Sequence, residues 1–129
     1  MGRFRRAEAG GAAGWLNGEL VIAGGTAWRD EQKIWLTHTQ LYSPKTKAWR
    51  RGPALPHAMA YGPSVYTSSG LEIFGGTDGL KVYRESWRLD AKKLAWAKIG
   101  EVPADVLLGK AIAVAGDIYL IGVVPMLQT

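Results

Sequence analysis

Short apolar runs alternate with polar turns along the chain, and their spacing leaves no room for a long helix. Three of these runs, at residues 20–23, 71–74 and 118–121, lead directly into glycine. The glycines that follow them are Gly24, Gly25, Gly75, Gly76 and Gly122. The first glycines of the three sets lie 51 and 47 residues apart. Recurrence of the same pattern at spacings of this size indicates a repeat protein.

Two further features return with each apolar run. A turn of small or polar residues precedes the run, and the three turns are Asn17-Gly18, Ser69-Gly70 and Gly116-Asp117. In the first two units a tryptophan follows at a fixed place: Trp49 lies seven residues after Tyr42, and Trp96 lies seven residues after Leu89. Because such turns join antiparallel strands, each one predicts a β-hairpin.

The pattern predicts four strands in each complete unit, joined in chain order. In the first unit we expect strands at residues 11–15, 20–23, 34–42 and 48–51, with residues 26–33 as a loop. In the second unit we expect strands at residues 61–67, 71–74, 85–90 and 94–99, with residues 77–84 as the loop. The third unit has strands at about residues 110–114 and 118–121, and the sequence then stops.

These landmarks resemble the kelch repeat, in which each unit forms one four-stranded blade of a β-propeller. The resemblance covers nearly the whole chain. It implies an all-β fold of antiparallel meanders, with about two and a half blades in an incomplete ring. The units would be residues 10–56, 57–103 and 104–129, the last one truncated.

An incomplete ring leaves sheet edges unpaired, and complete propellers have about four to eight blades. We therefore expect the chain to be a fragment of a longer propeller, in preference to a protomer that completes a ring with partners. We also expect the chain to self-associate through the unpaired blade edges.

Composition excludes several classes of function. The 129 residues carry a net charge of +5 and include no cysteine, so disulfides, thiolate nucleophiles and Cys-ligated metals are impossible. The basic residues are scattered and no row of stacking aromatics appears, so we expect no nucleic-acid partner. The longest apolar run is interrupted by Gly116-Asp117, so we expect no membrane span. No signal peptide is visible, which makes the cytoplasm the default location.

The candidate binding residues lie where the connections from strand 2 to 3 and from strand 4 to 1 meet, at one end of the blades. Loops on a rigid scaffold often carry binding residues. The residues placed on this loop face are Trp28, Arg29, Asp30, His57, Tyr61, Asp78, Lys81, Tyr83 and Arg84. We expect the Trp28 loop and the residue 77–84 loop to lie side by side, because adjacent blades bring equivalent loops together.

Trp28 has two interpretations, as a ring that stacks on a partner or as a lid folded back on its own blade. The pairs Arg29-Asp30 and Arg84-Glu85 either hold a polar ligand or form surface ion pairs. The other tryptophans are expected to pack between strands and blades: Trp35, Trp49, Trp87 and Trp96. His38 and His57 have no acidic companion at ligand spacing, so we expect neither a metal site nor a cofactor.

The leading functional hypothesis is a non-catalytic module that presents the loop face to a protein or carbohydrate partner. The alternative is part of a sugar mutarotase or epimerase, since the chain also resembles bacterial kelch proteins related to sialic-acid mutarotases and galactose oxidase. Copper radical chemistry of the oxidase kind requires a Cys–Tyr crosslink, which this chain cannot form. No catalytic residue of the mutarotases matches a position here. A third hypothesis is a gene fragment with no function of its own.

Overall fold

The computed structural model describes residues 8–123, which contain thirteen strands in four sheets and no helix. The first blade consists of β2 (Ala12–Leu16), β3 (Glu19–Ala23), β6 (Thr39–Ser43) and β7 (Ala48–Arg51). The second blade consists of β8 (Ser64–Thr67), β9 (Gly70–Phe74), β10 (Glu85–Asp90) and β11 (Trp96–Glu101). Within both blades every neighbouring pair of strands is antiparallel.

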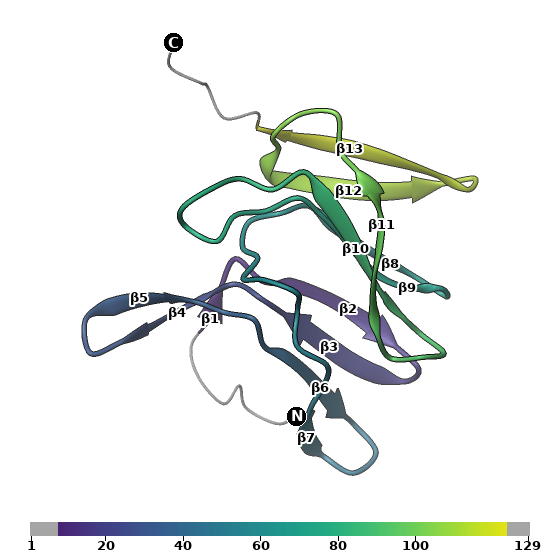
Figure 1. The fold of residues 1–129 in the computed structure, drawn as a ribbon. Coiled ribbons are helices and arrows are strands. Elements are labelled where there is room, and N and C mark those ends of the chain that lie inside the picture. Colours follow the sequence, from purple (N-terminus) through teal and green to yellow (C-terminus); the bar gives the residue numbers. More distant parts are fainter. Residues whose placement is uncertain (1–7, 124–129) are drawn as a thin grey trace.

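A two-stranded sheet of β12 (Leu107–Val114) and β13 (Asp117–Val123) follows the second blade. Figure 1 shows the two blades and this hairpin stacked one after another, with no closed ring. The fold is therefore all-β with about two and a half blades, as predicted. Among residues 8–123, β13 pairs only with β12.

The predicted hairpin turns are present at the inner strands. Asn17 and Gly18 have φ angles of 52° and 79°, as a two-residue turn with two left-handed positions requires. The other two turns each begin one residue earlier than predicted, at Ser68-Ser69 and Ala115-Gly116, because Thr67 pairs with Gly70 and Val114 pairs with Asp117.

The first unit departs from the prediction between its second and third strands. Residues 26–33 were expected to form a loop and residues 34–42 a single strand. Instead, β4 (Thr26–Arg29) and β5 (Gln32–Trp35) form a separate hairpin, and the third strand β6 begins only at Thr39. The physical reason is a second two-residue turn, in which Asp30 and Glu31 both take positive φ angles of 49° and 64°.

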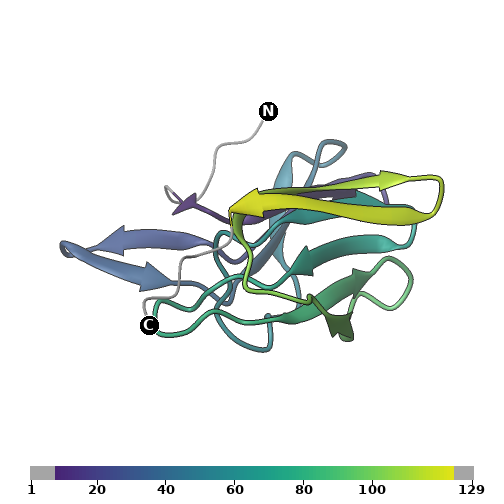
Figure 2. The same ribbon diagram turned by 90° about the horizontal axis from the view of Figure 1, so that it is seen from above.

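The short strand β1 (Glu8–Ala9) pairs with β4, which becomes the central strand of a three-stranded sheet. In both views the β4–β5 hairpin projects away from the stacked blades (Figures 1 and 2).

The hydrophobic core lies mainly between the first and second blades. Leu71, Leu89 and Val21 are completely buried, and Leu41 is 1% exposed. Gly14 permits close packing of the inner strands, because a Cβ atom there would lie 2.9 Å from the Cβ of Tyr66. The blades are thus held together by aliphatic side chains on facing sheets.

The tryptophan and glycine landmarks lie at the junctions of the fold. The Trp96 indole Nε1 of the second blade donates to the Pro53 carbonyl at 3.1 Å and to Thr39 Oγ1 of the first blade at 3.3 Å. In the first blade, the Tyr42 and Trp49 rings lie 5.0 Å apart. The glycine pairs Gly24-Gly25 and Gly75-Gly76 all have positive φ angles, and Gly122 packs against Gly109.

A further repeated feature surrounds the start of each inner strand and was not recognised in the sequence. Gly10, Tyr61 and Leu108 have positive φ angles of 75°, 65° and 57°, and each is followed by glycine. The Tyr61 amide donates to the Gly10 carbonyl, and the Leu108 amide donates to the Tyr61 carbonyl, both at 2.8 Å. These bonds link the three units at their inner strands, on the same 51- and 47-residue spacing.

Candidate functional site

The β4–β5 hairpin and the residue 77–84 loop project at the end of the blades opposite the β12–β13 turn (Figure 1). The segment between the blades, residues 52–63, joins them there. Its Met59 carbonyl accepts a hydrogen bond from Gly25 at 2.6 Å, and its Ala60 exchanges two backbone bonds of 2.9 Å with Thr77. The loop face is therefore anchored to the glycine pairs of both blades.

Trp28 lies on the projecting hairpin and is 70% exposed. It pairs across the hairpin with Lys33, and its neighbours Arg29 and Asp30 are exposed as well. This exposure excludes the interpretation of Trp28 as a lid packed on its own blade. An indole ring held on a paired strand, largely free of protein contact, is available to a partner.

The residue 77–84 loop is organised around the Asp78 carboxylate. Oδ1 accepts from the amides of Leu80 at 2.8 Å and Lys81 at 3.0 Å, and Oδ2 accepts from the Tyr83 hydroxyl at 2.7 Å. Thr77 Oγ1 adds a bond of 2.7 Å to the Lys81 carbonyl. The loop thus has a fixed shape, and it holds the Leu80 side chain at its tip 95% exposed.

These bonds perturb two acid–base groups. The Lys81 amide, followed by the Tyr83 hydroxyl and the Leu80 amide, lowers the pKa of Asp78 to about 2 from an ordinary value of 3.8. Donation to the same carboxylate raises the pKa of Tyr83. Both shifts favour the arrangement of an ionised Asp78 and a protonated Tyr83 at neutral pH.

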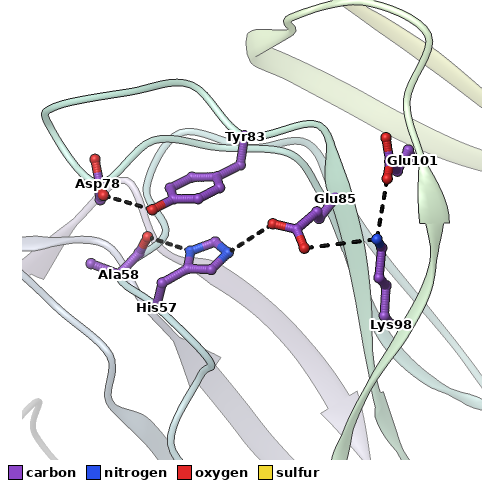
Figure 3. A network of polar contacts seen from close by, with 7 residues as sticks. All are labelled: His57, Ala58, Asp78, Tyr83, Glu85, Lys98 and Glu101. Carbon is purple, nitrogen blue, oxygen red and sulfur yellow. Dashed lines mark hydrogen bonds and ion pairs between the residues drawn. The ribbon is translucent and has the colours of Figure 1, made fainter.

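His57 packs beneath this loop, as Figure 3 shows. Its imidazole stacks on the Tyr83 ring with centroids 3.7 Å apart and planes inclined by 14°. Nδ1 lies 3.1 Å from the Ala58 carbonyl, and Nε2 lies 3.7 Å from Glu85 Oε1. The second distance is too long for a hydrogen bond. His57 is therefore positioned mainly by ring stacking.

Glu85 extends the network toward the second blade (Figure 3). Its Oε2 lies 3.8 Å from Lys98 Nζ, and Lys98 in turn lies 3.1 Å from Glu101 Oε2. The sequence suggests Glu85 as the ion-pair partner of Arg84, but in the structure Arg84 Nε lies 2.8 Å from Asp105 Oδ1. Because both side chains of that pair are partly exposed, it contributes little to stability.

A second cluster joins the two loops. Trp35 meets Tyr61 edge to face at 6.0 Å, and Lys33 Nζ lies 4.7 Å from the Trp35 ring centroid and 5.3 Å from that of Tyr61. The other side of the indole lies against Gly79, where an added Cβ would be 2.5 Å from Trp35 Cε2. Hydrogen bonding to Lys33, and then to Thr26, lowers the pKa of Tyr61.

The structure thus brings four candidate residues into one cluster, namely His57, Asp78, Lys81 and Tyr83. Tyr61 belongs to the neighbouring Trp35 cluster, whereas Trp28, Arg29 and Asp30 lie out on the hairpin and Arg84 faces Asp105. The equivalent loops are side by side, as expected, but Trp35 and Gly79 make the contact rather than Trp28. The binding roles of these residues stay predictions.

Residues 8–123 contain no group of three His, Asp or Glu side chains arranged to hold a metal ion. No helix in that range is suited to crossing a membrane.

The chain is similar in sequence to two known proteins and in fold to a solved structure. No protein-family profile matches the chain. The chain is 26% identical over 106 residues to spermatocyte protein spe-26 of Caenorhabditis elegans, an alignment that covers 80% of the chain and 18% of that protein. It is 24% identical over 104 residues to Kelch-like protein 21 of Danio rerio, covering 80% of the chain and 16% of that protein. The chain therefore spans less than a fifth of either relative.

Among solved structures, the fold matches that of YjhT with a TM-score of 0.78 and 14% sequence identity. The match covers 88% of this chain and 43% of that one. The chain has a kelch-type β-propeller fold. The resemblance drawn from the glycine, turn and tryptophan landmarks is confirmed, and the open arrangement of the kelch-type blades agrees with a partial propeller.

Three residues of the kelch-type loop face were missed as site residues. Trp35 was assigned to a strand of the first blade because it follows an apolar residue, and nothing in the sequence indicates its contact with the second unit. Gly79 follows Asp78 in a polar loop, and this sequence predicts only a turn, with no contact to the first unit. Leu80 carried a detectable signal, since a lone leucine in a polar loop is expected to be exposed.

Acid titration should reveal the contribution of Asp78 to stability. Its pKa in the folded chain, about 2, lies below the ordinary value of 3.8, so its stabilising effect is complete above about pH 4 and is lost as the pH falls toward 2. We expect Asp78→Asn to lower the urea midpoint at pH 6 and to lose less stability than the wild type between pH 4 and 2. Asp30→Asn, in an exposed turn, is the control. Equal acid dependence in all three proteins would contradict this role.

Proposed function

We propose that the chain is a kelch-repeat binding module that presents the strand 2–3 and 4–1 connections of its blades to a protein or carbohydrate partner. The exposure of Trp28 carries this proposal. A buried aromatic anchor is a common source of interface energy, and a ring already held on a paired strand loses little conformational freedom when it binds. The fixed residue 77–84 loop beside the hairpin supplies a second preorganised surface.

The candidate acid–base groups favour binding over catalysis. Both oxygens of the Asp78 carboxylate accept hydrogen bonds, and the Tyr83 hydroxyl donates one of these bonds. His57 is stacked beneath Tyr83, and its Nδ1 is within hydrogen-bond distance of the Ala58 carbonyl. These groups hold the loop in shape, which leaves them poorly arranged for proton transfer to a substrate. The mutarotase alternative therefore rests on the resemblance alone.

The exposed ring of Trp28 gives the direct test. Trp28→Ala should leave the melting temperature unchanged and reduce affinity by at least about 1 kcal/mol, roughly fivefold. A glycan array and a displayed random-peptide library are the two probe sets, and ligands selected on the wild type are then titrated against the variant.

The matched control is the double variant Lys45→Ala and Lys47→Ala. Both lysines lie in the turn at the opposite end of the first blade. This change should alter only the salt dependence of binding. Ligands that bind Trp28→Ala and wild type equally well would contradict the proposed use of the loop face. Selection of glycans rather than peptides would assign the carbohydrate class of partner.

A further inference from the structure

A hollow of about 430 Å³ lies between the two complete blades, at the end opposite the loop face. Residues 15–17 of the β2–β3 hairpin line one part of it, and residues 66–68 of the β8–β9 hairpin line another. Ala91, where the β10–β11 turn begins, completes the lining. In Figure 1 these three turns lie at the side of the molecule away from the β4–β5 hairpin. The volume is within the range of small-molecule sites, about 300–1,000 Å³.

The residues that line the hollow include no charged side chain. They supply instead the Asn17 amide, the hydroxyl groups of Tyr66, Thr67 and Ser68, and the Tyr66 ring. A charged ligand would lose hydration here without gaining a counter-charge from the lining, which costs free energy. A neutral ligand with several hydroxyl groups and an apolar ring face suits this lining better.

The Tyr66 side chain is fixed at its base and open beyond it. An added Cβ atom at Gly14 of the first blade would lie 2.9 Å from Tyr66 Cβ and 3.1 Å from its Cδ1, so the ring packs against the backbone of that strand. Tyr66 is nevertheless 53% exposed, and its hydroxyl forms no hydrogen bond within residues 8–123. A ring that is already held in place loses little conformational freedom when a ligand covers it.

The polar groups beside this ring keep unused hydrogen-bonding capacity. Asn17 takes a left-handed φ of 52°, and its Nδ2 donates to the Ala91 carbonyl at 2.6 Å, which fixes the side chain across the two blades. Its Oδ1 accepts no hydrogen bond from the part of the chain that the structure describes. Thr67 Oγ1 accepts from the Ser69 amide at 3.1 Å, and its own proton can still be donated. Donors and acceptors therefore lie together, which suits sugar hydroxyl groups because each of these both donates and accepts.

We propose that this hollow binds a neutral sugar ring. The apolar face of the sugar packs on the Tyr66 ring, and its hydroxyl groups bond to Asn17 Oδ1 and to the hydroxyls of Thr67 and Ser68. Acidic sugars are disfavoured because the lining provides no cation. The hollow is separate from the loop face, so this inference does not depend on the use of Trp28.

Two serines of one turn give a matched pair of variants. Ser68 and Ser69 are both exposed, but only Ser68 lines the hollow. Neutral and acidic glycans on an array are screened with the wild type, and the neutral glycans that bind are titrated by calorimetry. Ser68→Phe fills the hollow and should weaken their binding at least about tenfold, whereas Ser69→Phe should change it less than about twofold. A glycan that loses affinity for Ser68→Phe is a ligand of the hollow, and only ligands that keep their affinity for this variant test the loop face.

Nuclear magnetic resonance of the wild-type protein gives a second readout that needs no variant to fold. Asn17 is the only asparagine in the sequence, so its side-chain amide gives one identifiable pair of signals. A selected neutral glycan should shift these signals and those of the residue 66–68 amides, and it should leave the β4–β5 hairpin unchanged. Absence of neutral glycans among the ligands, a preference for acidic ones, equal losses in the two serine variants, or shifts confined to the β4–β5 hairpin would each overturn the proposal.

Discussion

Replacing Leu71 with alanine is expected to lower the free energy of unfolding by about 3 kcal/mol, within the usual range for a buried leucine. Leu71 is completely buried at the junction of the two complete blades, and its side chain touches the site where Gly14 brings the inner strands together. The substitution therefore leaves a cavity between two sheets that cannot approach each other further. Urea unfolding followed by tryptophan fluorescence measures the loss.

Two further variants make this result interpretable. Leu80→Ala removes the same atoms from a side chain that is 95% exposed, and it should change stability by less than about 0.5 kcal/mol. Leu71→Met conserves most of the volume and should cost less than about 1.5 kcal/mol, which provides a folded protein if the alanine variant unfolds. A loss below about 1 kcal/mol for Leu71→Ala would show that the blades do not share one core.

The sequence was sufficient to predict the blades because their signals are local. Asn17-Gly18 sets a turn through its own backbone preferences, and an apolar run followed by Gly24-Gly25 marks a buried strand and the tight connection after it. Each signal needs only neighbours in the chain. Repetition of the same signals at similar spacings, 51 and 47 residues, then indicates the kind of fold.

The features that escaped prediction depend on contacts or on unusual backbone. Asp30 suits a turn with two positive φ angles, but Glu31 stands where glycine is usual, so residues 26–33 carry no clear local signal for a hairpin. The left-handed conformation of Tyr61 and Leu108 is likewise unexpected for large side chains. Neighbouring units hold Tyr61 there through both its amide and its carbonyl.

The position of the candidate site follows partly from local signals, whereas its contacts depend on the path of the chain. Strand order alone placed Trp28, Asp78 and Tyr83 at one end of the blades, and that placement agrees with the structure. Which residue joins the two loops depends instead on the path of the hairpin. Once Trp35 belongs to β5 rather than to a strand of the blade, its indole reaches Gly79 in the next unit.

This contact leads to the second large effect, which concerns Gly79→Ala. Gly79 has a φ of 93°, and an added Cβ would lie 2.5 Å from the Trp35 ring. The left-handed backbone alone costs a non-glycine residue about 1–2 kcal/mol. Displacement of the indole adds to that cost, so we expect a total loss of about 2–4 kcal/mol in the free energy of unfolding. Urea unfolding measures it, and the tryptophan emission of the folded protein should shift to longer wavelength as the Trp35 ring becomes more exposed.

Gly18→Ala separates the two contributions. Gly18 also has a positive φ, of 79°, but a Cβ there would meet nothing within 4 Å. This variant should therefore show the backbone cost alone, about 1–2 kcal/mol, with unchanged tryptophan emission. The difference between the two variants reports the contact of Trp35 with the second unit. If Gly79→Ala costs no more than Gly18→Ala, the hairpin and the residue 77–84 loop are not coupled through this indole. If it costs more, the Trp35 indole couples the β4–β5 hairpin to the residue 77–84 loop of the second blade.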